Sequence, residues 1–238
     1  MKNTMKYKKN FSNKDEFLKK YETVAEGYDK HRLKDYEGKK VLEGQLNLLT
    51  KNLKTLKPKK ILEAGCGTGR ILLPLTKKGF KIEGFDLSKN MLSILNKKNP
   101  SIKTKIGDIE KIPYKNETFD FVYSITVLIH LPKIEKAISE LYRVTKKDGI
   151  LIFDLSNKDS IWTKLSVLIQ PNKKRTILYS RKDIKKILKK YNYEITGLFS
   201  YGRIFYKVPI IKYVASFLDK NLPLPISFRS QYIIKIKK

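Results

Sequence analysis

The sequence predicts an α/β fold with a doubly wound, mostly parallel sheet of seven strands, an antiparallel hairpin strand at its C-terminal end and a small helical cap. Short apolar runs alternate with amphipathic stretches through the middle of the chain, the pattern of strand–helix–strand units. The runs at 119–125 (FDFVYSI) and 149–155 (GILIFDL) are almost continuously apolar, as strands buried on both faces require. A chain of 238 residues, 41% of them hydrophobic, can bury such a core.

Two amphipathic helices are expected before the first strand, and strands and helices then alternate. The expected N-terminal helices are 14–29 and 37–55; the strands that follow are 60–64, 80–86, 102–106, 119–124 and 149–155; the later helices are 88–98, capped by Ser88, and 132–146, opened by Pro132.

The last third of the chain has a different pattern. Helices are expected at 158–169 and 181–190, and strands at 193–199 and 231–236. Two terminal strands separated by an insert favour an antiparallel hairpin at the edge of the sheet. The apolar insert between them, at about 200–229, predicts the small cap.

Composition excludes several classes of protein. One cysteine excludes an internal disulfide and a multi-thiolate metal site, and no H-E-x-x-H or H-x-E pattern occurs, so we expect no metal. No apolar stretch follows the basic N-terminus, and no apolar run reaches the roughly 18 residues that a membrane span needs. We therefore expect no transmembrane segment and a cytoplasmic protein.

The formal net charge of +29 raises the question of a polyanionic partner. Seven of the 52 basic residues are arginine and the rest are lysine. Proteins that read nucleic acids favour arginine, whose planar fork matches phosphate and guanine edges. Lysine also has A/T-rich codons, so genome composition accounts for much of this charge. The positive charge still attracts polyanions, and basic residues are concentrated at 173–190. A nucleic-acid partner therefore stays an alternative.

A glycine-rich turn follows the first expected strand. Residues 61–75 read ILEAGCGTGRILLPL, a strand that enters the turn GCGTG and continues directly into a helix. Glycine at alternate positions allows a tight turn and lets a ligand approach the backbone. A dinucleotide-binding turn would read G-x-G-x-x-G, but here the third glycine comes one residue early and Arg70 takes the place of the last.

Two acids follow at the ends of the next two strands. Asp86 lies 21 residues after Gly65, where a nucleoside-binding unit has the acid that accepts hydrogen bonds from ribose hydroxyls. Asp108 follows the third strand, where a carboxylate can accept a hydrogen bond from an exocyclic amine such as that of adenine. Open α/β sheets bind ligands at these strand ends, so the turn and both acids predict one nucleoside site.

The run EAGCGTGR…FDLS…GDIEKIPY…FDFVYSITVLIHL…ISELYRVTKKDGILIF resembles the class I S-adenosylmethionine-dependent methyltransferases, in particular the ubiquinone/menaquinone-methylase-like group. The resemblance covers about residues 60–155. It implies a Rossmann-like fold, S-adenosyl-L-methionine as the cofactor and S-adenosyl-L-homocysteine as its product. It also implies cofactor contacts for Tyr28, Gly65, Cys66, Gly67, Asp86, Leu87, Asp108, Ile109 and Ser124.

The resemblance gives these residues separate roles. Gly65, Cys66 and Gly67 would line the methionine part of the cofactor, and Tyr28 would fold over its carboxylate. Asp86 would hold the ribose, Leu87 would pack on the adenine, and Asp108 with the backbone of Ile109 would hydrogen-bond to the adenine edge. Ser124 would lie beside the reacting centre. Residues 1–57 would then cover cofactor and substrate, 58–157 would bind the cofactor, and 158–238 would complete the sheet and hold the substrate cap.

The implied reaction transfers a methyl group to an oxygen, nitrogen or carbon atom, and the expected acceptor is a small biosynthetic molecule. An oxygen or carbon acceptor needs a base. His130, just past the fourth strand, is the candidate; its alternative role is to anchor the loop before Pro132. Two other functions stay open: an RNA (tRNA) methyltransferase and a non-catalytic regulatory protein that binds S-adenosylmethionine.

Overall fold

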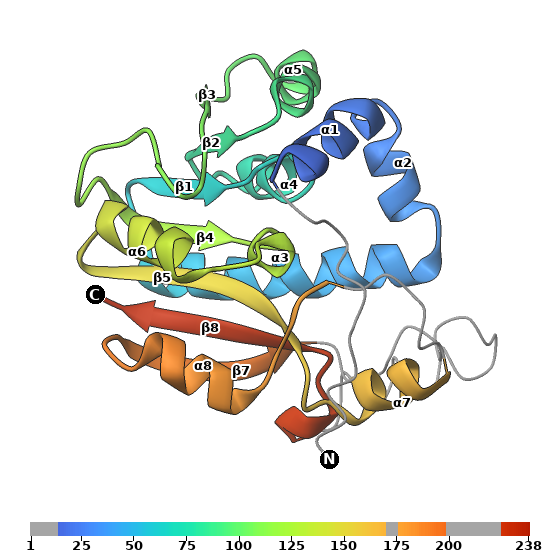
Figure 1. Ribbon diagram of the computed structural model, residues 1–238. Helices are drawn as coiled ribbons and strands as arrows, with labels where there is room; N and C mark the ends of the chain where they lie inside the picture. The colour runs from blue at the N-terminus through green and yellow to red at the C-terminus, as the bar shows by residue number, and fades with distance from the viewer. Residues whose placement is uncertain (1–13, 170–175, 199–224) are drawn as a thin grey trace.

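The computed structural model describes residues 14–169, 176–198 and 225–238, whose arrangement Figure 1 shows. Most of the predicted cap at 200–229 lies outside these residues. Strands form one sheet in the order β3-β2-β1-β4-β5-β8-β7, with β6 paired to the end of β5. Their bounds are β1 Ile61–Ala64, β2 Ile82–Asp86, β3 Thr104–Ile106, β4 Phe119–Ser124, β5 Thr145–Asn157, β6 Leu178–Tyr179, β7 Asn192–Leu198 and β8 Gln231–Lys237.

Strand directions confirm the predicted fold class. Strands β1 to β5 pair in parallel, whereas β8 runs antiparallel to β5 and to β7. The terminal hairpin therefore adds to the edge of the parallel sheet, as expected. The seven predicted strands form the main path. β6 is an additional strand of two residues, which is too short for a periodic pattern to reveal.

Helices cover both faces of the sheet (Figure 1). The helices are α1 Lys14–Val24, α2 Tyr28–Leu33, α3 Tyr36–Leu56, α4 Leu72–Lys77, α5 Lys89–Lys98, α6 Glu135–Val144, α7 Ile161–Ile169 and α8 Arg181–Leu188. Leu53 of α3 and Leu95 of α5 are fully buried in the core on one face of the sheet. Leu141 of α6 and Ile184 of α8 belong to the core on the other face. Two apolar cores thus hold a three-layer structure together.

The N-terminal helices and α6 differ from the prediction. A single helix over 14–29 is wrong, because α1 ends at Val24 and α2 begins at Tyr28. Gly27 precedes α2, and glycine disfavours a continuous helix. Helix α6 begins at Glu135 rather than at Pro132, after the 3₁₀ turn Leu128–His130. By contrast, Ser88 is the N-cap of α5, as predicted, and accepts a 3.1 Å hydrogen bond from the Met91 amide.

The strand order reverses between β1 and β4, and this reversal locates the site. The connections leaving neighbouring strands diverge there, which opens a crevice at their carboxyl ends. The glycine turn leaves β1, and Ile125 follows β4. Among the described residues, no helix has the length and apolarity needed to cross a membrane.

Candidate active site

A cavity of about 410 Å³ lies at the carboxyl ends of the parallel strands. This volume falls in the range of small-molecule and cofactor sites. Eight of the nine residues predicted to contact the cofactor line it: Tyr28, Gly65, Cys66, Gly67, Asp86, Leu87, Asp108 and Ile109. The topology therefore brings together residues from four separate stretches of the sequence.

The glycine turn forms one wall of this cavity, and two of its three glycines, Gly65 and Gly67, line it. Gly65 has φ +77°, and a Cβ there would lie 2.4 Å from Val127 Cγ2, so only glycine fits. Gly67 has φ +52°, but a Cβ there would meet only Asp86 Oδ2 within 4 Å, at 4.0 Å. The backbone of Gly67 therefore borders open space above Asp86, into which any side chain would project.

Asp86 ties the end of β2 to the glycine turn. Its Oδ2 accepts a 2.8 Å hydrogen bond from the Gly67 amide, and its Oδ1 accepts one of 2.9 Å from the Ser88 amide. Burial raises the pKa of this carboxyl, and the two backbone donors oppose that rise. Because Ser88 is the cap of α5, Asp86 is not the capping side chain of that helix. Asp86 lines the cavity, and its predicted contact with ligand hydroxyls stays a prediction.

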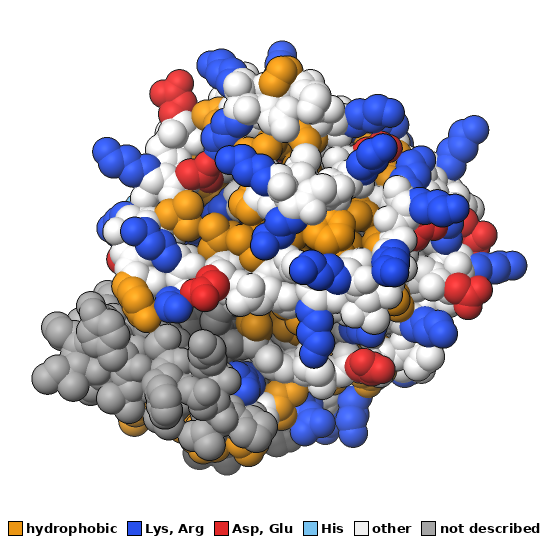
Figure 2. Space-filling model, turned by 180° about the vertical axis from the view of Figure 1, so that it is seen from behind, with side chains coloured by type: hydrophobic (Ala, Val, Ile, Leu, Met, Phe, Trp, Pro, Cys, Tyr) orange, Lys and Arg blue, Asp and Glu red, His pale blue; other side chains and the backbone are white. Residues whose placement is uncertain are grey.

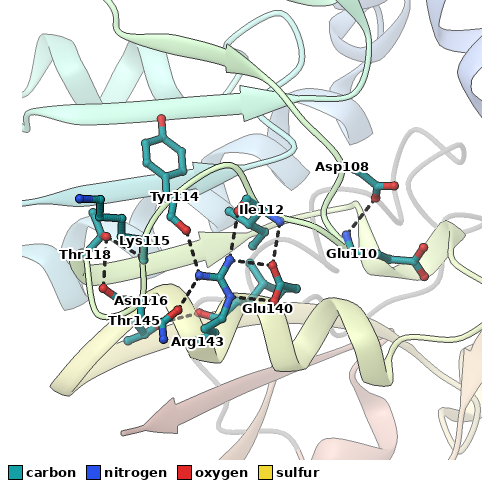
Figure 3. A network of polar contacts seen from close by, with 11 residues as sticks. Asp108, Glu110, Ile112, Tyr114, Lys115, Asn116, Thr118, Glu140, Arg143 and Thr145 are labelled. Carbon is teal, nitrogen blue, oxygen red and sulfur yellow. Dashed lines mark hydrogen bonds and ion pairs between the residues drawn. The ribbon is translucent and has the colours of Figure 1, made fainter.

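Asp108 lies at the start of a loop that Arg143 of α6 holds in place (Figure 3). The Arg143 guanidinium pairs with Glu140 at 2.7 Å and donates hydrogen bonds to the carbonyl oxygens of Ile112 and Tyr114 at 3.0 and 2.9 Å. Asp108 itself accepts a 2.9 Å hydrogen bond from the Glu110 amide, which orients its carboxylate. The loop is thus fixed from the outside, and its inner side faces the cavity.

Ser124 is the predicted site residue that does not line the cavity. It is fully buried, and its hydroxyl donates a 2.9 Å hydrogen bond to the carbonyl oxygen of Ala64. This bond joins the ends of β1 and β4. The cavity wall begins one residue later, at Ile125.

Glu63 lines the cavity but was missed from the sequence. It lies on β1, is 3% exposed, and its Oε2 accepts a 2.9 Å hydrogen bond from the Tyr123 hydroxyl. Burial raises the pKa of Glu63 to about 8, against the opposing effects of Tyr123 and Arg70. The side chain is therefore largely protonated at neutral pH and would lose its proton beside a cationic ligand. An acid within an otherwise apolar strand was the signal available in the sequence.

Aromatic side chains close the cavity on the side of the N-terminal helices. Phe17 and Tyr21 of α1 pack with their ring centroids 4.5 Å apart, and Phe17 lies 5.4 Å from the His130 ring. The Tyr21 hydroxyl is 3.4 Å from His130 Nε2. Burial, with smaller effects of Lys20 and Arg32, lowers the pKa of His130 to about 4, so its imidazole is neutral at neutral pH.

Helices α1 and α2, here called the cover helices, are fixed to the core by two acids. Asp29 accepts a 2.6 Å hydrogen bond from the Thr68 hydroxyl and forms an ion pair with Lys98 of α5. Glu22 accepts a 3.3 Å hydrogen bond from the Asn90 amide at the start of α5. The cover helices thus contact both the glycine turn and α5.

Comparison with known families identifies the core of the chain. A family model described as a methyltransferase domain matches residues 62–153, from β1 to β5, and the match includes the glycine turn, Asp86 and Asp108. The chain carries a class I S-adenosylmethionine-dependent methyltransferase domain. The resemblance noted from the motifs is confirmed.

Relatives of this methyltransferase domain match over the same core. Malonyl-[acyl-carrier protein] O-methyltransferase of Serratia marcescens is 31% identical over 93 residues, which are 39% of this chain and 36% of that protein. Demethylmenaquinone methyltransferase of Streptomyces avermitilis is 37% identical over 93 residues, 39% of this chain and 40% of that protein. The chain thus spans less than half the length of these two curated relatives.

A solved structure shares the fold over nearly the whole chain. Magnesium protoporphyrin IX methyltransferase from Synechocystis PCC 6803, solved with bound S-adenosylhomocysteine, superposes with a TM-score of 0.64 at 17% identity. The alignment covers 94% of this chain and 100% of that one. The likeness of fold therefore extends well beyond the matched core of residues 62–153.

The cavity of this methyltransferase domain fits S-adenosylmethionine. The open space beside Gly67 admits a ligand against the backbone, and Asp86 presents a carboxylate to it. Glu63, buried in the same lining, is suited to a cationic group such as an ammonium. Assignment of each predicted contact to a part of the cofactor stays a prediction.

Proposed function

We propose that the protein transfers the methyl group of S-adenosylmethionine to an acceptor on a small molecule. The observation that carries this proposal is the mostly apolar, half-open cavity, which the aromatic rings of Phe17, Tyr21 and Tyr28 border on the side of the cover helices. An apolar, aromatic wall suits a compact acceptor with an apolar part. A polynucleotide would need an open groove along which its backbone could run.

The distribution of surface charge also favours a small acceptor. On the face in Figure 2, lysine and arginine side chains are scattered, with acids and apolar side chains between them. They do not gather into one basic groove on that face. The net charge of +29 accounts for non-specific attraction to polyanions, but it supplies no specific nucleic-acid site there. The names of the two curated relatives, which act on a carrier-bound malonyl group and on a menaquinone precursor, agree with non-polymeric acceptors.

In this proposal the chain chiefly binds the cofactor, orients the acceptor and excludes water. S-adenosylmethionine supplies a methyl group already activated on a sulfonium. Asp86 and Asp108 hold the nucleoside end, which fixes the direction of the sulfonium. The cover helices keep water out and align the acceptor, and orientation of this kind can contribute roughly 7–11 kcal/mol.

Transfer of radioactive methyl groups tests the proposal. The protein is incubated with methyl-labelled S-adenosylmethionine and a cell extract separated into small-molecule, protein and RNA fractions. We expect label in the small-molecule fraction, and much less with Asp86→Asn. Label in RNA would favour the RNA methyltransferase, and binding without transfer to any fraction would favour the regulatory alternative. The exposed Glu194→Gln is the control for loss of one negative charge.

A further inference from the structure

Thr126, in the wall of the cavity just after β4, has an unusual backbone conformation. Its φ is +66°, in the left-handed region that β-branched residues rarely adopt. Ile125, Thr126 and Val127 all line the cavity. Strained backbone of this kind persists only where surrounding groups hold it, and it is concentrated at functional sites.

Asp154 of β5 is the group that holds Thr126. Its Oδ1 accepts a 2.6 Å hydrogen bond from the Thr126 amide. Asp154 is completely buried, and its Oδ2 has no hydrogen-bond partner among the described residues. Burying a carboxylate is costly, so a chain that needed only packing here would be better served by an apolar side chain.

A second contact reaches the Thr126 side chain from α3. Gln45, which is 1% exposed, donates a hydrogen bond of 3.3 Å from Nε2 to Thr126 Oγ1. The Oε1 of Gln45 accepts one of 3.0 Å from Arg70, directly after the glycine turn. Buried polar groups therefore connect Asp154 on β5, through Thr126 and Gln45, to the end of the turn that the cofactor approaches.

The position of Thr126 matters because of its neighbour Val127. A Cβ at Gly65 would be 2.4 Å from Val127 Cγ2, so the Val127 side chain occupies the space next to the glycine turn. If Thr126 relaxed to an ordinary backbone conformation, the following residue would move and that packing would change.

We propose that Asp154 is a positioning residue, which holds Thr126 in the left-handed conformation and so keeps Val127 packed against the glycine turn. The inference rests on the S-adenosylmethionine-binding domain and not on the identity of the acceptor. In this proposal, affinity for the cofactor depends on a residue of β5, although β5 contributes none of the predicted cofactor contacts.

A double-mutant cycle tests this role with S-adenosylhomocysteine as the probe, titrated by calorimetry. Asp154→Leu keeps a branched shape but removes the acceptor oxygen. Thr126→Gly removes the need for Asp154 to hold the backbone, because glycine adopts positive φ freely. Thr126→Ala also removes the γ atoms of Thr126, but alanine is still strained at positive φ. These two backgrounds are matched controls for each other.

We expect Asp154→Leu to weaken binding about tenfold in the wild-type and Thr126→Ala backgrounds, and less than about threefold in the Thr126→Gly background. Asp154→Asn, which keeps an acceptor oxygen, should bind within about threefold of wild type. Equal losses of affinity in the Thr126→Gly and Thr126→Ala backgrounds would overturn the proposal. An Asp154→Asn variant that binds as weakly as Asp154→Leu would overturn it as well.

The double-mutant cycle still tests the proposal if one variant fails to fold. If Asp154→Leu alone is not recovered as folded protein, Thr126→Gly should restore its folding and its binding, and Thr126→Ala should not. Failure of both double variants would show that Asp154 supports packing in general, and would overturn the proposal. Wild-type binding of S-adenosylhomocysteine, measured first, separates this result from any failure to find an acceptor.

Discussion

The amide of Gly67 donates a 2.8 Å hydrogen bond to Oδ2 of Asp86, which joins the glycine turn to the end of β2. The two residues are 19 positions apart in the chain and border the same open space in the cavity. A ligand that hydrogen-bonds to Asp86 therefore also lies against the backbone of Gly67.

Replacement of Asp86 by Asn should lower affinity for S-adenosylhomocysteine by tenfold or more. Hydrogen bonds to a charged group contribute roughly 1.5–3 kcal/mol, and Asn cannot accept from the turn, the Ser88 amide and a ligand diol as a carboxylate does. Calorimetric titration measures the loss, with Glu194→Gln as the control. The melting temperature should fall as well, because the Asn amide has one oxygen and leaves either the Gly67 or the Ser88 amide without its acceptor. Affinity equal to wild type would contradict the assigned role.

Alanine at Gly65 and at Gly67 should have different effects. At Gly65 the new methyl group collides with Val127, in addition to a left-handed cost of roughly 1–2 kcal/mol, so we expect a clearly lower melting temperature. At Gly67 the methyl group enters open space, so stability should fall less while cofactor affinity falls strongly. Thermal unfolding and titration of both variants separate the two effects. A Gly67→Ala variant with normal affinity would show that the ligand does not approach this backbone.

Glu63 should make the stability of the cofactor-free protein depend on pH. Its pKa is raised from an ordinary 4.5 to about 8, so the folded state holds a proton that the unfolded state lacks between these values. The stabilisation is therefore complete below about pH 4.5 and is lost as the pH rises through about 8.

The variant Glu63→Gln should remove this dependence, since it mimics the protonated acid and can still accept from Tyr123. Melting temperatures measured across this pH range, for the wild type, Glu63→Gln and the exposed control Glu194→Gln, should differ in slope only for the Glu63 variant. Parallel curves for all three proteins would mean that Glu63 is not protonated in the folded state.

His130 should contribute little as a general base. Its pKa of about 4 gives a small driving force for accepting a proton at neutral pH, and its Nε2 lies beside Tyr21. With an acceptor found by methyl labelling, His130→Asn should lower kcat less than about tenfold. General bases contribute roughly 10²–10⁴-fold, so a loss of a hundredfold or more would instead assign His130 that role.

Local chemistry explains which features could be predicted from the sequence. The Ser88 cap, the glycine turn and the acids at strand ends each depend on residues near one another in the chain, and the structure places all of them as expected. The break between α1 and α2 was missed because apolar spacing continues through Gly27, whereas the structure turns there.

Residues whose behaviour depends on distant partners could not be predicted. Burial raises the pKa of Glu63, and the partner that opposes this rise through a hydrogen bond, Tyr123, is 60 residues away. Asp154 acquires its role from Thr126, 28 residues earlier, and from a backbone angle that no sequence pattern signals. Ser124 was predicted from its place at a strand end, but one step along a strand turns a side chain to the opposite face.

The ion pair between Asp29 and Lys98 has a consequence for movement of the cover helices. Any movement of α2 away from the glycine turn and α5 would have to break this pair together with the hydrogen bond between Asp29 and Thr68. We expect added salt, which screens a partly exposed pair of this kind, to make such a movement easier.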